Sequence, residues 1–212
     1  MPSSILTFFL QGAAIGITAA VSPGPFQTFL ISQSLTGGFR RAAPVAFAPL
    51  VTDLPIILLS LFLLDQMPPY FLRLISLAGG LFVLYLAWGL WKSWRAGPDP
   101  GEAQATSAGG SLARGALANF LSPGPYLFWA LVNGPILLSA LHQSTSYGVA
   151  FLVGFYGLMI LTLLGIAMLF AQARRLGPRV VRALTLASAV ILVVFAGLLL
   201  KQAIWPAQVA GI

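Results

Sequence analysis

The sequence predicts an all-α membrane protein with several spans, and three observations point to this fold class. Only 15 of the 212 residues, or 7%, are formally charged, whereas a soluble domain carries roughly 25% charged residues. Hydrophobic residues make up 58% of the chain, and the mean hydropathy is +0.94. The apolar residues also occur in runs of about 20 or more, the length that a helix needs to cross a hydrocarbon core of ~30 Å. Together these observations exclude a soluble enzyme.

Six apolar segments are expected to cross the bilayer as helices, because their apolarity is continuous rather than periodic. They are residues 5–31, 43–64, 70–91, 115–141, 147–171 and 180–204. A stretch rich in glycine, proline and small polar residues, 92–113, separates the third segment from the fourth. We therefore predict two units of three spans, residues 1–91 and 114–212, joined by a linker over residues 92–113.

The basic residues predict how the chain is oriented. Nine of the eleven Lys and Arg residues fall on one side of the six predicted spans, namely Arg40, Arg41, Lys92, Arg95, Arg114, Arg174, Arg175, Arg179 and Arg182. Arg73 and Lys201 fall on the other side. Basic loops stay in the cytoplasm, so we expect a cytoplasmic linker and both termini outside. The net charge of +7 then reflects topology, and no nucleic-acid partner is expected. Trp88, Trp91 and Trp94 fall at the cytoplasmic end of the third span, where interfacial aromatic residues are expected.

The most informative motif is a tetrapeptide that occurs twice inside apolar runs. The first copy is Ser22, Pro23, Gly24 and Pro25, and the second copy is Ser122, Pro123, Gly124 and Pro125. An aromatic residue follows each copy, Phe26 in the first and Tyr126 in the second. Because each predicted unit has three spans, the first and fourth spans run in opposite directions. The two units are therefore expected to form an inverted-topology repeat, an arrangement that recurs in secondary transporters.

Each copy is expected to break its helix, because two prolines in four residues remove two backbone donors and clash with the preceding turn. A serine followed by proline also signals a helix start, with the serine as N-cap. A new half-helix would present free amide groups and about half a positive charge at its N-terminus, which attracts a carboxylate. The alternative is a simple kink without a ligand.

Asp53 is the only acid that the sequence places deep in the membrane. At ~1.5 Å per residue, Ser22 and Asp53 lie ~15 Å from the cytoplasmic ends of their spans and Ser122 lies ~11 Å from its own. A central carboxylate costs roughly 2.5 to 3.5 kcal/mol, which favours a function as counter-ion for a substrate ammonium or as proton carrier. The structural alternative is a neutral acid bonded to a helix backbone. Asn119 and Tyr126 flank the second break and complete the predicted binding site.

Other residues limit or extend these predictions. Cysteine is absent and the single histidine, His142, is predicted in a loop, so we expect no metal site, no cofactor and no catalytic residues. Gly12, Gly16 and Ala20 form a small-residue stripe that predicts close helix packing, although a dimer seam is an alternative. Three more polar residues lie within spans, and most of them are expected to form hydrogen bonds between helices: Thr52, Asn133 and Tyr156.

At these residues the chain resembles the lysine exporter (LysE) family, in the branch that includes the RhtB-type threonine and homoserine exporters. Similar segments are GGFRR at 37–41, AGGLFVLYLAWGLW at 78–91 and GALANFLSPGPYLFWALVNGPIL at 115–137. The resemblance implies a proton-motive-force-driven exporter of amino acids or related small solutes in the bacterial inner membrane. Two features differ from the family. The fourth span has Ser122, Pro123 and Gly124 where the family has Asn-Pro-Lys, and Thr52 replaces the usual glycine before the acid, so substrate identity does not carry over.

The sequence thus predicts a secondary exporter that works by alternating access. The two broken helices would bind the carboxylate of a small zwitterion, and Asp53 would bind its ammonium group until a proton replaces it. A passive channel is an alternative, but residues 147–171 and 180–204 contain few of the polar residues that a pore lining needs. An ion or metal transporter of the wider superfamily and a membrane assembly subunit are further alternatives. The expected partners are a small-molecule substrate and the lipid bilayer, while sodium coupling and a homo-oligomer stay open.

Overall fold

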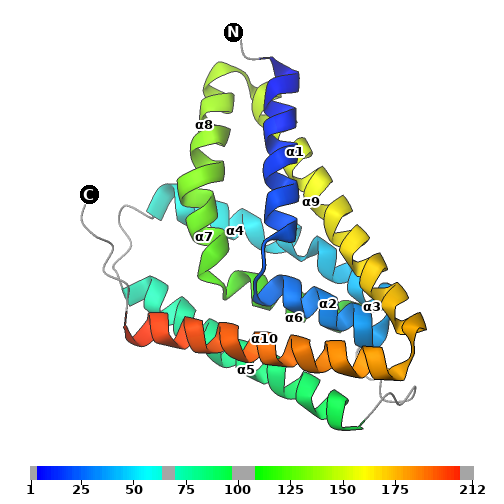
Figure 1. The fold of residues 1–212 in the computed structure, drawn as a ribbon. Coiled ribbons are helices and arrows are strands. Elements are labelled where there is room, and N and C mark those ends of the chain that lie inside the picture. The colour runs from blue at the N-terminus through cyan, green and yellow to red at the C-terminus, as the bar shows by residue number, and fades with distance from the viewer. Residues whose placement is uncertain (1–3, 64–69, 97–107, 206–212) are drawn as a thin grey trace.

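The computed structural model describes residues 4–63, 70–96 and 108–205, and in this part of the chain every regular element is a helix (Figure 1). The elements are α1 (Ile5–Val21), α2 (Pro25–Gly37), α3 (Phe39–Ala42), the 3-10 helix η1 (Ala43–Phe47), α4 (Ala48–Leu63), α5 (Tyr70–Ala96), α6 (Ala108–Phe120), α7 (Pro123–Phe128), the π-helix η3 (Trp129–Asn133), α8 (Gly134–Gln143), α9 (Thr145–Ala173), the 3-10 helix η4 (Arg174–Leu176) and α10 (Pro178–Ile204). The predicted all-α fold class is confirmed.

The described residues contain five helical segments that are long and apolar enough to cross a membrane, and a sixth if one bent pair counts as a single span. The five segments are Phe39–Ser60, Arg73–Lys92, Pro123–Gln143, Thr145–Leu176 and Pro178–Lys201. The bent pair consists of α1 and α2, whose axes differ by 68°. The chain is therefore a multi-pass membrane protein. Each candidate span overlaps one of the six predicted segments, but residues 115–120 of the predicted fourth segment belong to α6 and not to the span that begins at Pro123.

The first tetrapeptide separates α1 from α2, as predicted, but its serine does not begin the new helix. Ser22 is the C-cap of α1, and its hydroxyl donates to the Thr18 carbonyl at 2.7 Å. Gly24 is the N-cap of α2, with Pro25 in the first turn. Both Ser22 and Gly24 have extended backbones, since a residue before proline is disfavoured in the helical region. The prediction that the serine is the N-cap is therefore wrong for this copy.

The second tetrapeptide separates α6 from α7, and here the serine is the N-cap. The Ser122 backbone is extended, and Pro123 begins α7. The Ser122 hydroxyl donates to the Ala118 carbonyl at 2.7 Å. Ser22 likewise donates to the carbonyl four residues before it. Figure 1 shows the chain changing direction between α6 and α7. Both predicted helix breaks are thus present.

The helix α1 packs closely along α9, and glycines permit the approach. A Cβ atom at Gly12 would overlap the Phe151 carbonyl oxygen, and one at Gly16 would overlap that of Phe155. On the facing helix, a Cβ at Gly154 would overlap the Phe9 carbonyl oxygen. The interpretation of this small-residue stripe as close packing between helices is confirmed.

The other long helices pair across the two predicted units. The helices α5 and α10 lie side by side, and α10 also contacts α2 (Figure 1). Since α1 packs on α9 and α5 on α10, helices of residues 1–91 are interleaved with helices of residues 114–212. Of the predicted linker, residues 92–96 belong to α5 and 108–113 to α6, whereas 97–107 lie outside the described residues. The division into two inverted repeats stays a prediction.

Candidate functional site

The carboxylate of Asp53, on α4, is the centre of a buried polar cluster. Asp53 is only 4% exposed. One oxygen, Oδ1, accepts a hydrogen bond from Asn119 Nδ2 at 3.2 Å. The other, Oδ2, accepts from Trp129 Nε1 at 3.2 Å and from the Tyr156 hydroxyl at 3.1 Å. All three donors are neutral groups that hold the carboxylate in a fixed orientation.

The donors come from three elements that lie far from α4 in sequence. Asn119 belongs to α6, Trp129 begins the π-helix η3, and Tyr156 belongs to α9. Asn119 also donates to Thr52 Oγ1 at 2.7 Å, which ties it to the residue before Asp53. Single π-helical turns are frequent at functional sites because they rotate the side chains that follow them. The cluster therefore connects four elements through one acid.

The electrostatics of this cluster are unusual for a buried acid. Within the described residues, which include all Lys, Arg and His residues of the chain, no cationic side chain forms an ion pair with Asp53. An ionised carboxylate offers about four lone-pair sites, of which the neutral donors occupy three. The remaining site can accept a proton or a cationic group. No three His, Cys, Asp or Glu side chains of the described residues lie close enough to hold a metal ion.

An aromatic cluster packs beside Asp53. The Trp129 and Tyr156 rings stack with centroids 6.4 Å apart, and Phe155 packs edge-on against both, at 5.5 Å from Trp129 and 5.0 Å from Tyr156. Trp129 is 1% exposed. Aromatic faces attract organic cations, so this cluster is compatible with an ammonium group at the carboxylate.

The second tetrapeptide is joined to this cluster through Asn119, which lies three residues before Ser122. Ser122, Pro123 and Tyr126 are buried, while Gly124 is exposed and Pro125 is half-buried. The Tyr126 hydroxyl donates to the Phe120 carbonyl at 2.9 Å and so bridges the helix break. The Ser60 hydroxyl donates to the Tyr126 carbonyl at 3.1 Å. In this conformation Tyr126 supports the break and makes no hydrogen bond to Asp53.

The first tetrapeptide is not joined to Asp53 by any of the acid's hydrogen bonds. Ser22 and Pro23 are exposed, and Gly24 and Pro25 are half-buried. The break is bridged by Gln27, whose Nε2 donates to the Ala20 carbonyl at 2.9 Å. Of the predicted site residues, the structure thus brings Asp53 and Asn119 into contact, with the second tetrapeptide adjacent to Asn119.

Sequence reasoning missed Trp129 altogether and treated Tyr156 only as a hydrogen-bonding residue between helices, which is confirmed. Trp129 differs from Trp88, Trp91 and Trp94, since it lies in the middle of an apolar run. A buried indole N–H requires an acceptor, and that requirement was the available signal. Thr52 also bonds between helices as expected, whereas the buried Asn133 amide has no hydrogen-bond partner in the described part of the chain.

Comparison with known proteins identifies the family. The family model described as LysE type translocator matches residues 17–203. No curated protein and no solved structure matches the chain. The family comprises membrane exporters of amino acids and other small solutes, and its match includes the Asp53 cluster and both helix breaks. The chain belongs to the LysE type translocator family.

Proposed function

We propose that the protein exports amino acids or related small zwitterions from the bacterial cytoplasm, with Asp53 as the group that binds either the substrate ammonium or a proton. The observation that carries this proposal is a buried carboxylate with three neutral donors and no cationic partner among the described residues. In a membrane, an acid without a charged partner is costly. A substrate cation or a proton supplies the missing positive charge.

The proposed mechanism is secondary active transport by alternating access. Asp53 is bonded to elements from both predicted units, since α4 belongs to the first and α6, η3 and α9 to the second. A change of charge on Asp53 alters the strength of all three bonds at once, because hydrogen bonds to ionised groups are about twice as strong as neutral ones. Exchange of ammonium for a proton would then shift the packing between the units.

The two helix breaks supply the complementary half of the proposed site. Ser122, Pro123, Gly124 and Pro125 begin α7, next to Asn119, while Ser22, Pro23, Gly24 and Pro25 precede α2. Free amide groups at a helix start favour an anion, so the substrate carboxylate would bind there. In this scheme Asn119 positions Asp53, and Tyr126 holds the second break in shape.

The proposed location is the bacterial inner membrane, with the central linker in the cytoplasm and both termini outside. Nine of the eleven basic residues on one side of the predicted topology support this orientation. A small-molecule substrate and the lipid bilayer are the proposed partners.

Counterflow in proteoliposomes tests the proposed carrier function. Vesicles that contain the purified full chain are loaded with an unlabelled amino acid, chosen beforehand from those that raise its unfolding temperature. Uptake of the labelled amino acid from outside is expected to be several-fold faster than in unloaded vesicles, because a carrier returns faster with substrate bound. Equal uptake in loaded and unloaded vesicles would instead indicate a passive channel.

Replacement of Tyr156 by phenylalanine is expected to slow efflux at least about tenfold. The substitution removes one hydrogen bond to Asp53 Oδ2 and keeps the ring contacts with Trp129 and Phe155. A hydrogen bond to a charged group contributes about 1.5 to 3 kcal/mol, and about 1.4 kcal/mol corresponds to a factor of ten. Initial efflux rates from proteoliposomes measure the effect.

The matched control is Tyr147→Phe on the same helix, since the Tyr147 ring packs against Phe8, with centroids 5.5 Å apart. This variant is expected to transport at nearly the original rate. The same loss of rate in both variants would show that the Tyr156 bond to Asp53 has no special importance.

A further inference from the structure

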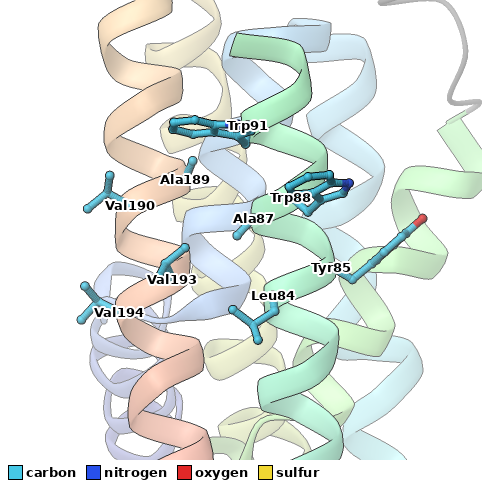
Figure 2. Close-up of a pocket in the computed structure, with 9 residues that line it drawn as sticks. All are labelled: Leu84, Tyr85, Ala87, Trp88, Trp91, Ala189, Val190, Val193 and Val194. Atoms are coloured by element: carbon cyan, nitrogen blue, oxygen red, sulfur yellow. The ribbon is translucent and has the colours of Figure 1, made fainter. Parts of the chain in front are cut away.

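The helices α5 and α10 enclose an apolar groove with a volume of about 580 Å³ (Figure 2). Its aliphatic lining comes from both helices, with Leu84 and Ala87 from α5 and Val190, Val193 and Val194 from α10. The valines at 190, 193 and 194 are each more than half exposed. The groove therefore offers an apolar surface that the chain itself leaves uncovered.

Aromatic side chains border the groove near the C-terminal end of α5. Figure 2 shows the Trp91 ring extending from α5 toward α10, beside Ala189. Trp88 also lines the groove and is 59% exposed. Trp94 lies one turn further along α5, with its ring centroid 4.9 Å from that of Trp91. Three tryptophans thus lie at this end of the groove, and two of them, Trp91 and Trp94, are in ring contact.

Three cationic side chains lie over these tryptophans. Lys92 Nζ is 5.7 Å from the Trp88 ring centroid, and the Arg95 guanidinium is 6.0 Å from that of Trp91. The Arg182 guanidinium reaches from α10 to 5.1 Å from the Trp94 ring centroid on α5. Cation–π contacts of this length hold a charge in place. Both helices therefore contribute fixed positive charge to one end of the groove.

No acid in the described part of the chain neutralises this charge. Asp53 is the only acid there, and its carboxylate is bonded to Asn119, Trp129 and Tyr156. The complementary ligand needs a negative group of phosphate type next to a long apolar portion. Basic pockets between transmembrane helices on the cytoplasmic side bind lipid headgroups in this way.

We propose that the groove between α5 and α10 binds one anionic phospholipid. An acyl chain lies along Leu84, Val193 and Val194, and the phosphate is bound by Lys92, Arg95 and Arg182. A second copy of this chain is a poorer occupant. In a two-fold symmetric interface the same patch faces itself, which would bring both sets of three cations together.

Native mass spectrometry of the purified full chain tests the proposal. The protein in detergent is mixed with phosphatidylglycerol or with phosphatidylcholine of the same acyl chains. We expect one phosphatidylglycerol molecule to stay bound at a concentration at least tenfold lower than phosphatidylcholine requires. Equal retention of the two lipids would overturn the proposal, because the headgroup charge would then be irrelevant.

Two kinds of variant separate the charge from the groove. The triple variant K92Q/R95Q/R182Q is expected to lose the preference for phosphatidylglycerol, whereas R40Q/R41Q/R114Q, with the same change of net charge, is expected to keep it. Val193→Trp fills the groove and leaves the three cations in place, and it is expected to weaken phosphatidylglycerol binding at least tenfold.

Three results would contradict the lipid site. An equal loss in the two triple variants would mean that only bulk charge matters. Full binding to the Val193→Trp variant would place the lipid elsewhere. The third result concerns the oligomeric state. If the original protein is a dimer whose mass does not change when lipid is removed, and if the Val193→Trp variant is a monomer, then a second copy occupies the groove.

Discussion

Asp53→Asn is expected to abolish solute efflux while the protein still folds and inserts. The amide has the size of the carboxylate, and its oxygen can still accept from Trp129 and Tyr156, while Asn119 can turn its own oxygen toward the new amino group. What is lost is the negative charge that the proposed mechanism requires. We expect efflux driven by an imposed pH gradient to fall at least ~100-fold, since the interaction removed is the one that a transported cation or proton would make.

The matched control is Asp99→Asn, which makes the same chemical change in the predicted linker and is expected to leave efflux unchanged. Thermal unfolding of both variants is measured in the same detergent, so that a folding defect can be distinguished from a transport defect. Full efflux by the Asp53→Asn variant would assign this acid a purely structural role. Loss of efflux together with a collapse of the unfolding temperature would indicate that the bonds of Asp53 mainly stabilise the fold.

The burial of Asp53 among the helices could be predicted because charge is scarce in this chain. With so few charged residues, laying them on the predicted spans leaves a single acid at depth. Asn119 could be predicted because it precedes a helix break. Trp129 could not, since tryptophan in a membrane protein more often belongs to the interface, and its bond to Asp53 depends on how α4 packs against η3. A continuous apolar segment predicts a membrane-spanning helix, but it does not indicate which other helix that segment will contact.

The two tetrapeptides show a second limit of sequence reasoning. Both break a helix, as the prolines require, but Gly24 is extended whereas Gly124 lies within α7. The bias of a residue before proline against the helical region is a preference rather than a rule. Tertiary contacts decide the outcome, since Ser122 and Pro123 of the second copy are buried whereas Ser22 and Pro23 of the first are exposed. Identical residues therefore produce the same break with different helix starts.

The first predicted span ends at residue 31, yet α2 continues to Gly37. Several polar residues follow residue 31. Their hydroxyl groups are satisfied within the helix, because Ser34 donates to the Leu30 carbonyl at 2.9 Å and Thr36 to the Ser32 carbonyl at 2.8 Å. Gln33 accepts a bond from Ser111 on α6 at 3.1 Å. Serine and threonine can thus extend an apolar helix when their side chains bond back to its carbonyls.

Gly154→Ala is expected to lower the unfolding temperature of the purified protein, because the added methyl group would overlap the Phe9 carbonyl oxygen on α1. Because the overlapped atom belongs to the backbone of α1, a side-chain rotation cannot remove the overlap, and α1 and α9 would have to move apart along their whole contact. Overpacking of this kind costs about 1 to 3 kcal/mol, which corresponds to a decrease on the order of 5 °C for a chain of this size.

Gly157→Ala, one turn further along α9, is the matched control, since its added Cβ would meet no atom within 4 Å in the described part of the chain. Alanine favours the helix by up to about 1 kcal/mol over glycine, so the unfolding temperature of this variant is expected to stay constant or rise. Opposite shifts in two variants with identical chemistry would attribute the stability to the contact between α1 and α9. A decrease of equal size in both would mean that α9 requires glycine for its own backbone, and that the close approach of α1 contributes little.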